Sequence, residues 1–392
     1  MRIWITIRTG CLDWKSTLPK KRKQPVLSSL QKMAADLSAQ AKKSRVFLSM
    51  PYIPGITPAC MESADIHCFQ DEATGLERRD GYFCARDAAL SPFDHGNLYG
   101  DGVFEGIRID NRRVLMLREH IDRWLKSASR LNLQFPYSRE ALAGIIVRLC
   151  RETFVGGEIS GYLRPVLTRG IGNLGVNPAK CIAPTVYIIC SSILLYPRER
   201  YETGIDVSIA RKIRRNDARH LDPNIKTNNY LNNVLALLET RHTGALETLM
   251  LTDDGYVAEA TADNIFIAET VNGQNRLTVP DARYALVGMT RNLVIDTARS
   301  LGFEIVESDT LLPTDFVGTS REVFITGTAC GLMPVCHIDG LPAAQPGHRP
   351  LLDRIREALA ERSINDSVSF NIDDDDHALA EYMAQTDCCS VA

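Results

Sequence analysis

The sequence lacks any apolar run near the roughly 18 residues that a membrane-spanning helix requires. It also lacks an excess of charge of one sign. Its 45 Lys and Arg nearly balance 48 Asp and Glu, which leaves a formal net charge of -3. A nucleic-acid or membrane surface extending over the whole molecule is therefore not expected, and we predict neither as a partner.

The cysteines show neither the spacing of a metal site nor that of a disulfide framework. The chain has 11 of them, scattered from Cys11 to the adjacent Cys388 and Cys389, and none forms a repeated C-x-x-C pair at zinc spacing. A chain of 392 residues can bury a core large enough to fold without such cross-links. We expect free thiols in a reducing compartment and no metal.

The first 62 residues differ in composition from the rest. They are rich in Lys and Arg, contain Ser, and have only Asp13 and Asp36 as acidic residues up to position 60. This composition is typical of a mitochondrial transit peptide. The cluster Lys20–Lys23 equally fits a nuclear localisation signal, and a disordered extension without a targeting signal is a further alternative. We predict a cytoplasmic or mitochondrial protein.

Strands and helices mix between the two ends, which predicts an α/β fold with two domains. A buried strand at Thr185–Cys190 is followed by Pro197 and charged residues, so the domain boundary is expected near residues 190–200. The acidic run Asp373–Asp376 predicts a solvated, disordered tail. The predicted parts are an extension 1–62, a small domain 63–192, a linker 193–200, a larger domain 201–362 and a tail 363–392.

Apolar spacing and turn residues locate the main elements. Apolar residues three and four positions apart predict one-sided helices, and Asp-Gly or Asn-Gly between apolar runs predicts hairpins. Helices are expected at Glu119–Leu131, Asn228–Thr243 and Thr290–Leu301, and hairpin turns at Asp254–Gly255 and Asn272–Gly273.

The segment Gly170–Gly175 fits the G-x-G-x-x-G pattern of dinucleotide-binding folds. In those folds the glycines must open a helix, but Pro178 follows closely here and disfavours helical backbone at Asn177. We therefore interpret the segment as a glycine-rich loop between domains.

Lys226 stands at the entrance of the predicted helix 228–243, with few charges around it and an Asn-rich turn after it. By base rate a lone lysine is a solvated surface group. In enzymes that use pyridoxal 5'-phosphate (PLP), however, a lysine binds the cofactor aldehyde. Such enzymes also need an anion site for the phosphate, a partner for the pyridine nitrogen and a site for the substrate carboxylate.

Three segments can supply those groups. Glu259 lies on a strand face beside an apolar residue, where a carboxylate needs a cationic partner such as a protonated pyridine nitrogen. Gly288 precedes a helix start, so the free N–H groups of Met289 and Thr290 can bind a phosphate. The turn Thr326–Ala329 can present N–H groups to an anion. Taken singly, these features also fit a surface glutamate, an ordinary N-cap and a connecting turn.

Together, the order and spacing of these segments resemble the class IV (fold type IV) aminotransferases. The matching segments are Asp94–Arg108, Glu119–Arg123, Tyr162–Pro165, Lys226–Tyr230, Tyr256–Asn264, Gly288–Arg291 and Thr326–Ala329. The resemblance implies a small α/β sandwich domain, a larger pseudo-barrel domain and the cofactor PLP. It also implies a homodimer that acts on small amino acids and 2-oxo acids, with the loop at Gly175–Val176 reaching the neighbouring subunit.

The resemblance further implies roles for single residues. Lys226 would bind the cofactor and carry the proton that moves during catalysis, and Glu259 would keep the pyridine nitrogen protonated. The implied cofactor-binding residues are Arg123, Lys226, Tyr230, Glu259, Met289, Thr290 and Thr328. The implied substrate-binding residues are Tyr99, Phe104, Tyr162, Arg164, Thr328 and Ala329.

Within the family, Tyr162 and Arg164 resemble the branched-chain, L-specific group, in which an arginine can also pair with the side-chain carboxylate of glutamate. The sequence thus predicts transamination between leucine, isoleucine or valine and 2-oxoglutarate. The lysine segment, however, lacks the two glycines of many branched-chain enzymes, and Val287 replaces a common proline. The alternatives are a D-amino-acid aminotransferase, an aminodeoxychorismate-lyase-like enzyme, a specialised secondary-metabolite aminotransferase or an inactive interaction protein.

Overall fold

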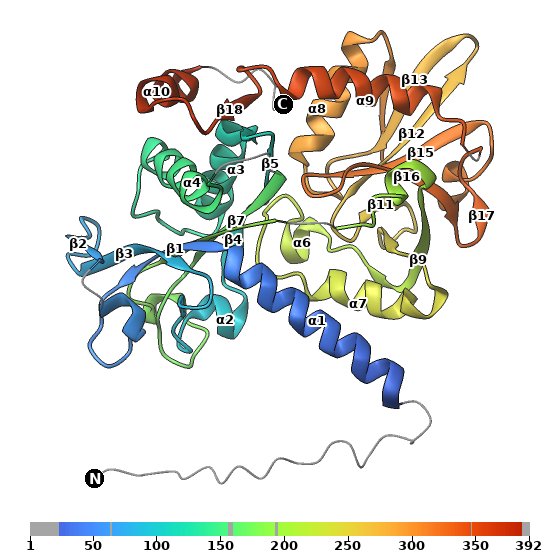
Figure 1. Cartoon of the computed structure of the whole chain (residues 1–392). Coiled ribbons are helices and arrows are strands. Elements are labelled where there is room, and N and C mark those ends of the chain that lie inside the picture. Colours follow the sequence, from blue (N-terminus) through green and yellow to red (C-terminus); the bar gives the residue numbers. More distant parts are fainter. Residues whose placement is uncertain (1–22, 63–64, 156–159, 193–194, 346, 386–392) are drawn as a thin grey trace.

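The computed structural model describes residues 23–62, 65–155, 160–192, 195–345 and 347–385 (Figure 1). The predictions for Cys11, Lys20–Arg22, Cys388 and Cys389 lie outside these ranges. In the described residues, two sheets of nine strands each form the framework, and helices cover them. In the described ranges, no helix is long and apolar enough to cross a membrane.

The first sheet has the strand order β18-β6-β5-β7-β8-β1-β3-β2, and β4 pairs with β7. Each described pair in it is antiparallel. Its strands are β1 (Arg45–Pro51), β2 (His67–Gln70), β3 (Glu77–Cys84), β4 (Gly102–Phe104), β5 (Ile107–Asp110), β6 (Arg113–Leu115), β7 (Ser160–Thr168), β8 (Thr185–Ser191) and β18 (Ser369–Asn371).

Two helices bury their apolar faces against this sheet. Helix α3 covers nearly the whole predicted range 119–131, and its Ile121, Trp124 and Ala128 lie in the core beside Ile146 of α4. Burying an isoleucine such as Ile121 or Ile146 stabilises the fold by about 1.5–3 kcal/mol. The helices of this part are α1 (Lys23–Lys43), α2 (His95–Tyr99), α3 (Leu117–Arg130), α4 (Arg139–Thr153) and α10 (Asp376–Ala384).

The second sheet has the order β11-β10-β9-β16-β15-β12-β13-β14, and β17 pairs with β16. Strand β9 pairs in parallel with both β10 and β16, so this sheet is mixed. Its strands are β9 (Ile205–Arg214), β10 (Glu247–Leu251), β11 (Val257–Ala260), β12 (Asn264–Val271), β13 (Gln274–Pro280), β14 (Glu304–Ser308), β15 (Arg321–Gly327), β16 (Gly331–Ile338) and β17 (Leu341–Pro342).

The two predicted hairpins in this sheet are confirmed. β10 pairs with β11 across Asp254–Gly255, and β12 pairs with β13 across Asn272–Gly273. Asn272 and Gly273 have φ of 50° and 81°, the left-handed backbone that a tight hairpin turn demands. The helices of this part are α5 (Arg200–Thr203), α6 (Ala218–Leu221), α7 (Leu231–Thr240), α8 (Met289–Ser300) and α9 (Pro350–Ser363). Short 3-10 helices span Ala59–Glu62, Pro178–Lys180, Arg241–Thr243 and Pro313–Phe316.

The interpretation of residues 1–62 as an extension is wrong for its second half. Strand β1 lies between β3 and β8 inside the first sheet, and Phe47 and Leu48 are only 1% exposed. The prediction for residues 1–62 rested on their overall composition, which is dominated by basic residues. The apolar signal of a strand of only 7 residues is lost in an average over so long a segment. Residues 1–22 lie outside the described ranges.

The prediction of a disordered acidic tail is also wrong for residues 363–385. Strand β18 pairs with β6, and Phe370 and Ile372 are buried in the core of the first sheet. Two contacts order the acidic run. Asp373 forms an ion pair with Arg112, and Asp375 caps α10 by accepting a hydrogen bond from the N–H of Ala378. A charge run can be ordered once partners distant in the sequence neutralise it.

Helix α7 confirms a helix within the predicted range 228–243, and its apolar face is exposed. Only Asn233, Ala236 and Thr240 are buried, so the helix contributes little apolar area to this chain's own core. Its large apolar residues face outward instead, and Leu231, Val234, Leu235 and Leu238 are 69%, 47%, 41% and 49% exposed. An apolar patch of this kind marks a contact surface.

Candidate active site

A cavity of about 620 Å³ collects residues of both sheets and of the segments between them. Of the twelve residues predicted for cofactor or substrate, it brings eleven together. These are Phe104, Arg123, Tyr162, Arg164, Lys226, Tyr230, Glu259, Met289, Thr290, Thr328 and Ala329. The loop at Gly170–Gly175, rejected above as a dinucleotide motif, opens no α-helix and runs instead into a short 3-10 turn at Pro178–Lys180.

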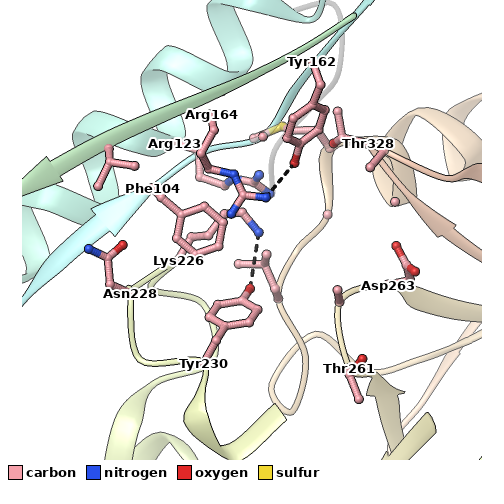
Figure 2. A pocket seen from close by; sticks show the side chains of 18 of the residues that line it. Phe104, Arg123, Tyr162, Arg164, Lys226, Asn228, Tyr230, Thr261, Asp263 and Thr328 are labelled. Atoms are coloured by element: carbon pink, nitrogen blue, oxygen red, sulfur yellow. Dashed lines mark hydrogen bonds between the residues drawn. The ribbon is translucent and has the colours of Figure 1, made fainter. Parts of the chain in front are cut away.

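Lys226 reaches this cavity from a segment that is tied to β4. Thr227 forms a β-bridge with Val103, and the N–H of Phe104 donates to the carbonyl of Lys226 at 2.9 Å. The lysine Nζ lies 3.3 Å from the Tyr230 hydroxyl and 4.6 Å from the centre of the Phe104 ring (Figure 2). The amine is therefore held inside the pocket and not free in solvent.

Arg123 projects from α3 into the same cavity and is held there by a buried acid. Glu105 is fully buried and accepts from Nε and Nη2 of Arg123 at 2.7 and 2.8 Å. It also contacts Nδ1 of His120 at 2.8 Å. Burial alone would raise the pKa of Glu105, but Arg123 and His120 outweigh burial and hold that pKa well below its usual value.

The start of helix α8 offers donors to an anion. Gly288 is the N-cap residue, and within the described ranges the N–H groups of Met289 and Thr290 donate to no protein acceptor. A Cβ at Gly288 would lie 2.2 Å from Oδ1 of Asn264, so the close approach requires glycine. These free donors lie at the positive end of the helix, beside Arg123, whose Nη1 donates to the Val287 carbonyl.

Glu259 is buried in β11 with its two carboxylate oxygens in different environments. Oε1 accepts from Nε of Arg215 at 2.5 Å, while Oε2 accepts from Leu286 N at 3.2 Å and from Asn264 Nδ2 at 3.4 Å. Burial raises the pKa of Glu259, and Arg215 opposes that rise. The predicted need for a cationic partner is thus met in part by Arg215, which the sequence did not reveal.

Tyr162 and Arg164 project from β7 over the cavity. The Arg164 Nη2 donates to the Tyr162 hydroxyl at 3.2 Å, and its guanidinium lies 4.5 Å from the Phe104 ring centre (Figure 2). The Tyr162 hydroxyl lies against Gly106, where a Cβ would come within 1.9 Å of it. The cationic guanidinium of Arg164 thus lies over the aromatic ring of Phe104 in the cavity wall.

The turn after β15 closes the opposite side of the cavity. Figure 2 shows Thr328 across the pocket from Phe104 and Lys226. In the described residues, the N–H groups of Thr328 and Ala329 donate to no protein acceptor, since the hairpin pairing stops at Gly327 and Gly331. Two free donors of this kind can bind a carboxylate or a phosphate oxygen.

Tyr99 is the exception among the predicted residues. It is 37% exposed, does not line the cavity, and its hydroxyl donates to the carbonyl of Leu174. Tyr99 thus does not line the cavity of its own chain, and its contact with the substrate stays a prediction. Tyr99 belongs instead to a surface with the exposed loop residues Leu174 and Val176.

Several polar residues of the cavity were missed by sequence reasoning. In the cavity lining they include Asn228, Asn264 and the buried Asp263, while Glu105 and Arg215 pair with the lining residues Arg123 and Glu259. Asp263 and Asn264 stand within the matching segment Tyr256–Asn264, and this position was the one available signal. In the described residues, no group of three or more His, Cys, Asp or Glu is placed to hold a metal, and the described cysteines are free thiols.

Known proteins are similar to this chain in sequence. The family model for amino-transferase class IV matches residues 102–338. A Methanocaldococcus jannaschii protein provisionally named a branched-chain-amino-acid aminotransferase is 42% identical over 65% of this chain and 84% of its own length. A D-alanine aminotransferase of Listeria innocua is 30% identical over 71% of this chain and 92% of its own.

A solved structure shares the fold as well. A T.th. branched-chain amino acid aminotransferase with pyridoxamine 5'-phosphate is 29% identical, has a TM-score of 0.67, and matches 74% of this chain and 96% of its own. The cavity fits such a cofactor, since free N–H groups beside Arg123 suit a phosphate and a buried carboxylate suits a pyridinium. The chain thus belongs to the class IV aminotransferases, which have fold type IV and use PLP.

Proposed function

We propose that this chain transfers the amino group of a branched-chain L-amino acid to 2-oxoglutarate. The observation that carries the proposal is the pair Tyr162–Arg164, with the Arg164 guanidinium over the Phe104 ring, in the cavity that the Thr328–Ala329 turn also lines. An apolar side chain can lie along Phe104, while a side-chain carboxylate can pair with the Arg164 guanidinium. The same pocket would thus take leucine and glutamate in turn.

The site residues divide the work. PLP, when bound, supplies the aldehyde that takes the amino group and a ring that accepts electrons. Lys226 would hold that aldehyde and then carry the proton at its Nζ, and the Tyr230 hydroxyl at 3.3 Å would orient this amine. Glu259 would keep a proton on the pyridine nitrogen, and Arg215 opposes the rise in the pKa of Glu259 that burial causes.

Anions would be bound at two places. Arg123, with the N–H groups of Met289 and Thr290, would hold the phosphate at the start of α8. The N–H groups of Thr328 and Ala329 would orient the substrate carboxylate, and Thr328 would also contact the phosphate. Closure of these donors around the ligand excludes water from the reacting atoms.

Amino transfer from L-leucine to 2-oxoglutarate tests the proposal, with glutamate as the measured product. Arg164→Gln should lower kcat/KM for the half-reaction with glutamate roughly tenfold or more, because the charge-assisted pair is lost, and should affect leucine much less. Arg148→Gln, on the outer face of α4, is the matched control. Absence of glutamate from leucine in the loaded enzyme would contradict the proposal.

A D-amino-acid aminotransferase is the second candidate. The lysine segment Lys226–Tyr230 lacks the glycines common in branched-chain enzymes, and D-alanine aminotransferases are among the relatives. Activity with D-alanine but not with L-leucine would favour it. Release of pyruvate from aminodeoxychorismate without an amino acceptor would identify the lyase alternative, and a narrow preference for an unusual amino acid would indicate a specialised enzyme.

The active form is proposed to be a homodimer. The outward leucines of α7 and the exposed loop residues Leu174 and Val176 supply apolar area that this chain leaves uncovered. Tyr99 lies beside that loop, so this surface would contribute to a neighbouring subunit's cavity. A domain boundary at residues 193–200 and a cytoplasmic or mitochondrial location are further proposals. Limited proteolysis and cell fractionation would test them.

A further inference from the structure

Asp263 is a buried acid in the cavity wall to which the reaction above assigns no task. It is 4% exposed and lies between β11 and β12. Its Oδ1 accepts from the thiol of Cys330 at 3.3 Å, and its Oδ2 is enclosed without a hydrogen-bond partner in the described residues. A buried carboxylate with one weak donor is poorly stabilised as an anion.

The carboxyl group of Asp263 lies directly behind the Thr328–Ala329 turn. A Cβ at Gly327 would come within 1.9 Å of Asp263 Oδ1, so the acid occupies the space that a side chain at 327 would fill. Asp263 therefore touches the turn at Gly327 and again at Cys330. Figure 2 shows it on the same side of the pocket as Thr328.

The charged groups around Asp263 come from several elements. Burial, then the charge of Glu247 on β10, raises the pKa of Asp263 to about 7. Glu259 on β11 acts in the same direction, while the Cys330 thiol and Lys226 oppose it. The phenol of Tyr196 donates to Glu247 at 3.4 Å on the far side of this cluster.

Of the two neighbouring acids, Asp263 is the better site for the shared proton. Glu247 accepts from the N–H of Thr248 at 2.6 Å and from the N–H and hydroxyl of Thr261 at 3.3 and 2.6 Å. These donors favour the charged form of Glu247, whereas Asp263 has only the thiol. Two adjacent buried acids do not both ionise readily, so Asp263 keeps the proton.

We propose that Asp263 acts as a neutral carboxylic acid behind the Thr328–Ala329 turn, and that loss of its proton weakens the binding of carboxylate substrates at that turn. This rests on the proposed function, which places the substrate carboxylate there. Ionised Asp263 would repel the bound anion through a medium of low polarity. The expected loss of affinity is on the order of tenfold.

Linkage fixes the sign of the pH dependence. A bound anion favours the protonated acid, so ligand binding near pH 7 takes up a proton, and affinity falls as pH rises through the pKa of Asp263. A residue that merely packs behind the turn would change affinity equally at every pH. The pH profile therefore separates a titrating acid from a structural one.

The test is calorimetric binding of 4-methylvalerate, a carboxylate without an amino group, to the PLP-loaded enzyme from pH 5.5 to 8.5. Measurement in two buffers of different ionisation heat counts the protons taken up. The native chain should lose about tenfold in affinity across this range. Asp263→Asn, nearly the same in shape, should lose that dependence and the proton uptake, while Asp254→Asn in the exposed hairpin turn should keep both.

Glu247→Gln provides a second test if Asp263→Asn does not fold. Removing a neighbouring negative charge should move the midpoint to lower pH, because less repulsion opposes ionisation of Asp263. An unchanged midpoint, or a dependence retained in Asp263→Asn, overturns the inference. If leucine transamination is intact in that case, only this inference fails, whereas absence of any amino transfer would overturn the proposed function itself.

Discussion

Replacement of Glu105 by Gln tests whether the buried pair with Arg123 organises the phosphate side of the cavity. The native carboxylate is fully buried, accepts two hydrogen bonds from Arg123 and contacts His120. Removing one member of a buried ion pair leaves an uncompensated charge and costs about 3–5 kcal/mol. We expect a loss of that size in the free energy of unfolding, together with weaker PLP binding.

Chemical denaturation of the cofactor-free protein measures the first effect, and titration with PLP followed by absorbance measures the second. Glu152→Gln is the matched control, because its partner Arg148 is 65% exposed and such a pair contributes at most about 1 kcal/mol. The two variants should therefore differ clearly. If Glu105→Gln were no less stable than Glu152→Gln, the argument from burial would be refuted.

The same pair has a defined pH dependence. The pKa of Glu105 is lowered in the folded chain from its ordinary 4.5. Its stabilising contribution is therefore present in full above that ordinary pKa, and it is lost as pH falls through the lower folded value. The native chain and Glu105→Gln should differ in free energy of unfolding by the same amount at pH 6 and pH 8. This difference should shrink only in strong acid.

Two further predictions concern the start of α8 and the face of α7. Gly288→Ala should weaken PLP binding by about 1–3 kcal/mol in the same titration, because the new Cβ would lie 2.2 Å from Asn264 Oδ1. Gly144→Ala is the control and should bind PLP with native affinity, because the space around Gly144 is open. Equal affinities would refute the close approach. Leu231→Glu with Leu235→Glu should convert the protein to monomers in sedimentation velocity, while Leu341→Glu, at an exposed site on β17, should not. A double variant that sediments as the native protein would exclude α7 from the subunit interface.

Local sequence patterns predicted the structure correctly where neighbouring residues determine the backbone conformation. The Asp-Gly and Asn-Gly turns fix two hairpins, because those residues adopt positive φ at low cost. The one-sided spacing in α3 predicts its buried face correctly. The family segments likewise brought Lys226, Glu259 and the start of α8 into one cavity.

Contacts between distant parts of the chain could not be predicted in this way. Arg215 is 44 positions from Glu259, and Asp373 is 261 positions from Arg112, so no local pattern connects either pair. The ordered tail and the central strand β1 depend on such partners. Helix α7 shows the converse case, since its apolar spacing was correct but indicates an outer contact surface and not the core of the same chain.

Covalent trapping of the cofactor tests the central claim most directly. The protein is loaded with PLP, reduced with borohydride and digested, and the modified peptide is identified by mass spectrometry. The account predicts the adduct on Lys226, whose Nζ lies 3.3 Å from the Tyr230 hydroxyl in the cavity. In Lys226→Ala, both the adduct and amino transfer should disappear. An adduct on another lysine, or amino transfer that persists in Lys226→Ala, would contradict it.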